Sequence, residues 1–273
     1  MQKFVILSDL HLVPEGQTSH GIDTFPRLTK ALAHIRTHHE DAAFVILDGD
    51  LADHAEIPAY ERLKAAIADF PLPVHMTMGN HDDRAVFHKV FPDRPMNPAT
   101  TQYDMGLDLG AYRVIILDST EPGKTEGYLS TAQIAWLRDE LTATSDKPVI
   151  CVLHHNITDF TVPTDVIRLQ NPAPLIDALK AHPDMRMVIS GHVHMSTAGT
   201  VRGVPFTTIA GSHYNIFPKQ SGPISEVPRL FGPGQMAVVM AGEESVVVHH
   251  ENFLDQHEEQ DLALFQWEPE DDA

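Results

Sequence analysis

Five apolar runs in this 273-residue chain each end in side chains that can bind a metal ion. In chain order, those side chains are Asp9 and His11, Asp50, Asn80 with His81, His154, and His192 with His194. Mixed carboxylate, amide and imidazole ligands suit divalent ions such as Mn, Fe, Co or Zn. A thiolate site would need several cysteines, and the chain has only Cys151. The ligand types therefore favour a borderline divalent metal over a thiolate site, and the single cysteine argues against thiol redox chemistry.

Each motif by itself also has an ordinary explanation. The segment from Asp48 to Asp50 reads as a turn, Asp-x-His as a polar loop, and His154-His155 as surface. The five motifs become informative together, because parallel strands bring their carboxyl ends to one rim of a sheet. Asp9-x-His11 and His192-x-His194 have the period-two spacing that points both members the same way. We therefore expect one metal centre, in which Asp50 can bridge two ions.

Alternating strands and helices must position these motifs. We expect strands at residues 3–7, 44–47, 73–78, 112–117, 148–153 and 187–189. We expect one helix from a cap at Asp23 or Thr24 to about His39, one through Phe91, and others at 57–70, 131–141 and 175–181. From residue 197 the pattern becomes β-rich, with strands at 200–202, 205–209, 236–240 and 246–250. We predict a single α/β domain over residues 1–254, with lid or assembly loops at 156–174 and 218–234. An acidic tail follows at 255–273.

Charge and composition limit the partners. The formal net charge of −19 argues against nucleic-acid polymers, although bound cations would still permit a small phosphate ester. The chain lacks an apolar stretch long enough to cross a bilayer and a recognisable signal peptide, which predicts a cytoplasmic protein. Cys151 lies in a strand-like run and should pack as a small hydrophobic residue. Either the tail or the 218–234 loop could support a homo-oligomer.

The ordered motifs Asp9-Leu10-His11, Gly49-Asp50, Gly79-Asn80-His81-Asp82, His154 and Gly191-His192-Val193-His194 resemble those of the calcineurin-like metallophosphoesterase superfamily. Within it, the block from Asp50 to Asp53 and the following Tyr60 resemble bacterial class III cyclic-nucleotide phosphodiesterases and related glycerophosphodiesterases. This resemblance implies a four-layer α/β/β/α sandwich of two mixed β-sheets flanked by helices, a metallo-dependent phosphatase-like fold. The late β-rich segment would form a second sheet beside the first.

The same resemblance implies two divalent ions and their ligands. Asp9, His11, Asp50 and His194 would hold the first ion, and Asp50, Asn80, His154 and His192 the second. A metal-bound hydroxide would attack phosphorus, while His81 stabilises the transition state or protonates the leaving oxygen. Asp53 is a candidate to orient His81, or it caps the following helix.

The substrate expected from the motifs is a small phosphodiester, such as cyclic AMP or a glycerophosphodiester. A diester carries less charge than a monoester, and no arginine cluster accompanies the motifs. His20, Arg84 and His213 are candidates to contact the part of the substrate that does not react. The alternatives are a phosphomonoesterase or nucleotide-lipid pyrophosphatase on the same scaffold, a non-catalytic metal-binding interaction protein, and a metal-storage or sensing protein.

Overall fold

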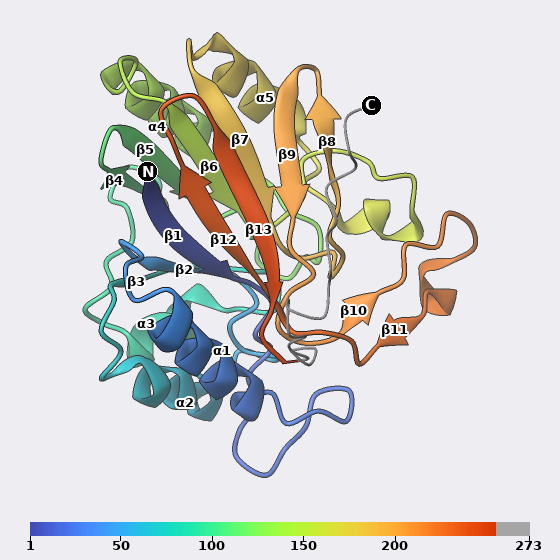
Figure 1. Ribbon diagram of the computed structural model, residues 1–273. Coiled ribbons are helices and arrows are strands. Elements are labelled where there is room, and N and C mark those ends of the chain that lie inside the picture. Colours follow the sequence, from blue (N-terminus) through green and yellow to red (C-terminus); the bar gives the residue numbers. More distant parts are fainter. Residues whose placement is uncertain (255–273) are drawn as a thin grey trace, which may run out of the picture.

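Two β-sheets face each other in the computed structural model, which describes residues 1–254 (Figure 1). Helices cover the outer face of each sheet. The predicted acidic tail at 255–273 lies outside the described residues. Within the described part, no helix is both long and apolar enough to traverse a bilayer.

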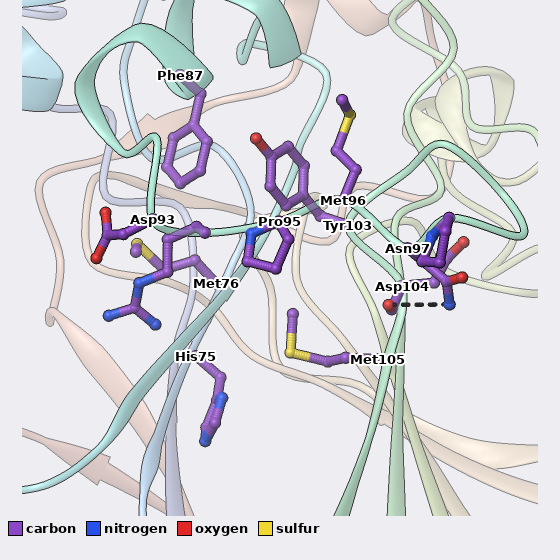
Figure 2. A pocket seen from close by; sticks show the side chains of 12 residues that line it. His75, Met76, Phe87, Asp93, Pro95, Met96, Asn97, Tyr103, Asp104 and Met105 are labelled. Atoms are coloured by element: carbon purple, nitrogen blue, oxygen red, sulfur yellow. Dashed lines mark hydrogen bonds between the residues drawn. The ribbon is translucent and has the colours of Figure 1, made fainter.

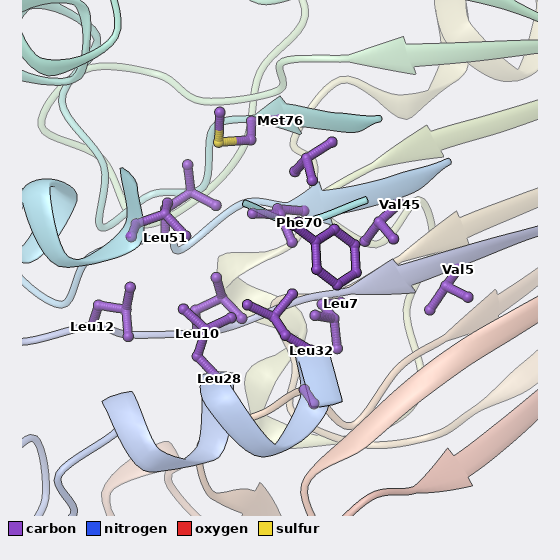
Figure 3. Packing of buried hydrophobic residues seen from close by; sticks show 14 of the residues in the cluster. Val5, Leu7, Leu10, Leu12, Leu28, Leu32, Val45, Leu51, Phe70 and Met76 are labelled. Atoms are coloured by element: carbon purple, nitrogen blue, oxygen red, sulfur yellow. The ribbon is translucent and has the colours of Figure 1, made fainter. Parts of the chain in front are cut away.

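The first sheet has the strand order β13-β12-β1-β2-β3. Its members are β1 (Gln2–Leu7), β2 (Val45–Asp48), β3 (Val74–Thr77), β12 (Gln235–Ala241) and β13 (Val246–Asn252). The first three strands run parallel, and β12 pairs antiparallel with β1. Three helices cover this sheet: α1 (Phe25–His38), α2 (Ile57–Ile67) and α3 (Arg84–Val90). Figure 3 shows the packing, in which Leu28 and Leu32 of α1 meet Leu7 and Val45.

The second sheet has the strand order β4-β5-β6-β7-β9-β8. Its members are β4 (Met105–Leu109), β5 (Tyr112–Leu117), β6 (Val149–Leu153), β7 (Met185–Ser190), β8 (Ala198–Val201) and β9 (Val204–Thr208). The helices α4 (Thr131–Ala143) and α5 (Pro172–Ala181) pack on its outer face. The short elements are η1 (Pro163–Ile167), η2 (Ile224–Glu226), and a two-stranded ribbon of β10 (Asn215–Ile216) and β11 (Arg229–Leu230).

A cluster of apolar side chains fills the space between the two sheets. Phe4 and Ile46 of the first sheet and Val114 and Ile150 of the second belong to this cluster and are all buried. Successive side chains of a strand point to opposite faces of its sheet, so a strand buried on both faces packs against the helices on one side and against the other sheet on the other. The predicted four-layer α/β/β/α sandwich is therefore confirmed. Cys151 is also fully buried in an apolar cluster, as predicted.

The assignment of late strands to sheets was wrong. They do not form a second sheet: β12 and β13 extend the first sheet, while β8 and β9 extend the second. The second sheet instead begins at β4, a strand the sequence pattern missed because Gly106 and Asp108 are poor strand residues. Antiparallel pairing with β5 stabilises β4. In the register of this pair, Met105 lies opposite Ile116 and Leu109 lies opposite Tyr112. The five ligand-bearing strand ends therefore belong to two sheets, and not to the single rim expected.

Candidate metal centre

The seven predicted metal ligands all lie just beyond strand ends of the two facing sheets. Asp9 and His11 follow β1, Asp50 follows β2 and Asn80 follows β3, while His154 follows β6 and His192 and His194 follow β7. Five of the seven have positive φ: Asp9 (54°), His11 (44°), Asp50 (48°), His192 (68°) and His194 (48°). Such backbone costs about 1–3 kcal/mol per residue outside glycine and concentrates at functional sites. The strain marks these loops as a built site.

Two glycines allow the loops to approach so closely. Gly49 has φ of +76°, and a Cβ there would lie 2.6 Å from Nδ1 of His154. A Cβ on Gly191 would collide with the side chain of Ser8, which follows β1 in the other sheet. The glycines within the predicted motifs are thus explained by packing between loops, because a larger residue would push the two sheets' loops apart.

Asp50 lies at the centre of the cluster. Its Oδ2 is 3.5 Å from Nε2 of His11 and 3.3 Å from Nε2 of His154, while its Oδ1 accepts a 2.8 Å hydrogen bond from the backbone N–H of His81. On one side, the ligand atoms of Asp9, His11 and His194 lie within 4.8 Å of one another, and on the other side those of Asp50, His154 and His192 do. A carboxylate placed between two such groups is suited to bridging.

Each of the four histidines is oriented by an oxygen that contacts its other ring nitrogen. Nδ1 of His154 donates to the carbonyl of Asp48 at 2.7 Å, and Nδ1 of His194 donates to the carbonyl of Tyr214 at 2.7 Å. Nε2 of His192 donates to the carbonyl of Ile167 at 2.9 Å. Nδ1 of His11 lies 3.0 Å from Oδ1 of Asp53. Metal-binding histidines are commonly held in this way, which leaves the opposite nitrogen with a free lone pair.

These orientations leave lone pairs that a cation would satisfy. Nε2 of His11 and Nε2 of His194 lie 3.3 Å apart, and both Nδ1 atoms contact oxygens elsewhere, so the two Nε2 atoms face each other. Among the described residues, Nε2 of His154 and Oδ1 of Asn80 are buried without a hydrogen-bond partner. Buried acceptors without partners are costly. The donor set of carboxylates, imidazoles and one amide therefore fits divalent metal ions.

Burial sets the ionisation of two of the ligands. It lowers the pKa of His194 to about 4, although the charge of Asp9 opposes the change. Burial also holds the pKa of His192 well below its usual range, and neighbouring His155 and His154 add to the effect. Both side chains are neutral imidazoles at pH 7, the form that binds metal.

His81 lies at the edge of this cluster, with its side chain 36% exposed. Its Nδ1 donates to the backbone carbonyl of Asp53 at 2.6 Å, whereas the carboxylate of Asp53 is 4.0 Å away and contacts His11 instead. Asp53 does not cap a helix either, because Glu56 occupies the N-cap position of α2. The backbone of Asp53 thus orients His81, and its side chain orients His11, a predicted metal ligand. His11, Asp50 and His81 also form a group of potential ligand atoms within 4.8 Å.

A cavity of about 310 Å³ opens above the ligands, and Asp50, Asn80, His81, His192 and His194 line it. We call the seven predicted ligands the floor. Residues from later segments form what we call the wall: Thr164 and Ile167 of η1, Tyr214, Ile216 of β10, Ile224 of η2, Val227, and Arg229 of β11. Both loops predicted as lids, 156–174 and 218–234, therefore contribute to the cavity. Figure 1 shows the β10–β11 ribbon projecting from the sandwich.

The wall contains two residues that the sequence analysis missed. The ring of Tyr214 stacks on His194, with centroids 4.2 Å apart and planes 3° from parallel. The guanidinium of Arg229 lies 5.3 Å from the centroid of the same ring. Arg229 sits within a glycine- and proline-rich loop that has no periodic pattern, so no sequence signal pointed to it. Tyr214 was only one position from the candidate His213.

The three predicted substrate residues lie elsewhere. Arg84 forms hydrogen bonds of 2.6 and 2.7 Å with the buried carboxylate of Asp118. His213 is buried behind the ligands, with ring centroids 4.8 Å from His11, and His20 is exposed with its ring 5.1 Å from Tyr214. Within the described residues, none of the three lines the cavity above the floor. Their assignment to substrate binding stays a prediction without direct geometric support.

A larger cavity, of about 630 Å³, lies away from the floor, beside Phe87 of α3 and the loop at 93–98 (Figure 2). Met76, Met96 and Met105 give it an apolar lining, and Asn97 donates to the carbonyl of Asp104 at 3.3 Å. Among residues 1–254, none of the seven ligands lines this cavity. Its size alone does not make it the reactive site, because the groups that could perform chemistry converge at the floor.

The chain matches a known protein family and several related proteins. Residues 2–196 match the calcineurin-like phosphoesterase family, a span that contains all seven floor residues. A probable cyclic nucleotide phosphodiesterase of Rhodopseudomonas palustris is 32% identical over 92% of this chain and 93% of the relative. The cAMP/cGMP dual specificity phosphodiesterase of Mycobacterium tuberculosis is 30% identical over 76% of this chain and 66% of the relative.

Solved structures share the fold at much lower sequence identity. A dimetal phosphatase from Danio rerio superposes with a TM-score of 0.68 at 15% identity, covering 93% of this chain and 97% of that one. A purple acid phosphatase from yellow lupin superposes with a TM-score of 0.66 at 13% identity, covering 93% of this chain and 52% of that one.

Proposed function

Because the chain belongs to the calcineurin-like phosphoesterase family, we propose that this metal-dependent phosphodiester hydrolase acts on 3',5'-cyclic nucleotides. The observation that carries the proposal is the convergence of floor ligands from two sheets on Asp50, directly beneath an open cavity. The relatives named as cyclic nucleotide phosphodiesterases support the choice of substrate.

The floor would hold two ions. Asp9, His11, Asp50 and His194 would ligate one, and Asp50, Asn80, His154 and His192 the other. Two divalent ions in such a site supply Lewis acidity and positive charge at the phosphoryl group. Mn, Fe, Co and Zn all suit this donor set. Metal analysis of protein purified from its own host would identify the native pair.

His81 would move a proton. Its Nδ1–H is engaged by the carbonyl of Asp53, so Nε2 is the nitrogen that can exchange a proton with substrate. His81 lines the cavity beside Asn80 and is partly exposed. These contacts support a role in which His81 protonates the leaving ester oxygen or donates a hydrogen bond to the transition state.

The wall would bind the remainder of the substrate. Arg229 is the one arginine or lysine among the described residues that line this cavity, and it can pair with a non-bridging phosphoryl oxygen. A single cation matches the single negative charge of a diester better than the two charges of a monoester. Ile216, Ile224 and Val227 add an apolar surface suited to a nucleoside.

We further propose that the enzyme works in the cytoplasm, and that a homo-oligomer would form through either the loop at 218–234 or the tail at 255–273. Fluorescence localisation and light scattering of the purified protein would test these two points separately from catalysis.

Substrate profiling tests the proposal. Chelated protein would be resupplied with Mn²⁺ and assayed with cyclic AMP, cyclic GMP, a glycerophosphodiester and p-nitrophenyl phosphate, a monoester. We expect the cyclic nucleotides to be hydrolysed with the highest kcat/KM, and Asn80→Ala to lose this activity. Asn97→Ala, which alters the cavity in Figure 2, should keep it. Preference for the monoester would replace the proposal with a phosphomonoesterase, and a glycerophosphodiester preference would change the substrate class.

A further inference from the structure

A second group of potential metal ligands lies outside the floor, where α1 meets the edge of the first sheet. It consists of His34 on α1, His39 immediately after that helix, and Glu251 on β13. Glu251 lies opposite Met236 in the register of β12 and β13. This His34–His39–Glu251 cluster shares no residue with the floor, and it plays no part in the proposed hydrolysis.

In this cluster two imidazole nitrogens contact the same carboxylate oxygen. Nε2 of His34 is 3.1 Å and Nε2 of His39 is 2.8 Å from the same oxygen, Oε2 of Glu251. All three ligand atoms lie within 4.8 Å of one another. Tetrahedral donors at zinc bond lengths of 2.0–2.2 Å stand about 3.3 Å apart. Small side-chain movements would therefore admit an ion.

Burial and charge also suit a cation. The side chains of His34 and His39 are 11% and 9% exposed, and that of Glu251 is 32% exposed, so the cluster is ordered yet open to solvent on one side. Burial alone would raise the pKa of Glu251, but hydrogen bonds from His39 and His34 outweigh it and lower the pKa. The carboxylate is thus ionised at neutral pH. Nδ1 of His39 is buried with no hydrogen-bond partner among the described residues, so no other group fixes its tautomer.

We propose that His34, His39 and Glu251 form a third metal site, separate from the dinuclear floor, that binds one Zn²⁺ or similar borderline divalent ion. Two imidazoles and one carboxylate match the ligands that zinc accepts, and they leave a coordination position for water. The ion would join the end of α1 to β13, which is an edge strand of the first sheet. Such a link ties two segments more than 200 residues apart in sequence.

Counting bound zinc tests this proposal. Chelated native protein and Glu251→Gln would be titrated with Zn²⁺ against a chromophoric chelator, with cyclic-nucleotide hydrolysis and melting temperature measured in parallel. His249→Gln is the matched control, because His249 lies on the same strand and is exposed. We expect native protein and His249→Gln to bind one more zinc equivalent than Glu251→Gln, while all three proteins hydrolyse the substrate at the same rate under Mn²⁺. Zinc should also raise the melting temperature less in Glu251→Gln.

Equal zinc equivalents in the native protein and Glu251→Gln would overturn the proposal, as would loss of an equivalent from His249→Gln. If Glu251→Gln does not fold, the double variant His34→Gln/His39→Gln gives the same comparison. These outcomes are independent of the proposed function, because failure of hydrolysis in the native protein would leave the zinc count unchanged.

Discussion

The floor and the wall of the 310 Å³ cavity are built in different ways. Floor ligands such as Asp9, His154 and His194 are at most 2% exposed and stand on loops anchored directly to strand ends. Wall residues such as Arg229 and Ile224 are exposed, and they come from short elements outside both main sheets. The difference suggests a division of labour, in which a rigid floor fixes the chemistry and a more open wall selects the substrate.

Among the substitutions considered, that of Asp50, the predicted bridging residue, should reduce hydrolysis most. Asp50→Asn retains the side-chain shape but removes the charge shared by both predicted ion sites, so both ions should be lost and hydrolysis abolished. Measured metal content and kcat test this together. If the variant kept two bound ions and the native rate, Asp50 would not be the bridging ligand.

His81→Asn should separate chemistry from metal binding. Loss of a proton-transfer group costs typically 10²- to 10⁴-fold in rate, and we expect a fall in kcat within that range while two ions stay bound. The exposed neighbour His54 provides the control variant His54→Asn, which should keep near-native turnover. If His81→Asn lost metal and activity together, His81 would be a ligand and not a proton donor.

Asp53→Asn should act through His11. The 3.0 Å contact from Asp53 fixes the ring of that ligand, and loss of such a partner typically weakens metal binding 10- to 100-fold. We expect low activity at limiting Mn²⁺ and recovery at high Mn²⁺. The backbone contact to His81 is unaffected by the substitution, so a defect that excess metal does not restore would contradict this role.

Substitution of the wall residue Arg229 should have the smallest effect on catalysis. Arg229→Met removes one exposed charge-assisted contact, for which we expect KM for cyclic AMP to rise about tenfold with kcat little changed. Arg84→Met provides a comparison, since the Arg84 side chain is bound to Asp118 and should affect stability more than KM. A fall in kcat without a change in KM would show that Arg229 belongs with the chemistry and not with substrate binding.

The sequence could predict that the floor side chains converge because the signals for that convergence are local. Each ligand lies within a few residues of an apolar strand, so periodicity and residue type suffice to place it. The sheet order was not accessible in this way, since β12 pairs with β1 across more than 200 residues. No local pattern distinguishes that pairing from a separate late sheet.

The wall illustrates the same limit. Arg229 reaches the cavity because β11 pairs with β10 and Tyr214 stacks on His194, contacts that a glycine- and proline-rich segment does not reveal. Arg84 and Asp53 show the converse limit, because closeness in sequence does not determine which groups two side chains contact. Both lie close to the motifs in sequence, but Arg84 pairs with Asp118 and the Asp53 carboxylate contacts His11 instead of His81.

The most direct test of the central claim is a titration of chelated protein with Mn²⁺, in which bound metal and cyclic AMP hydrolysis are measured on the same samples. We predict no turnover in the chelated protein and a rate that rises until the floor holds two ions. Full turnover without bound metal, or two bound ions with no hydrolysis of any phosphodiester, would contradict the account.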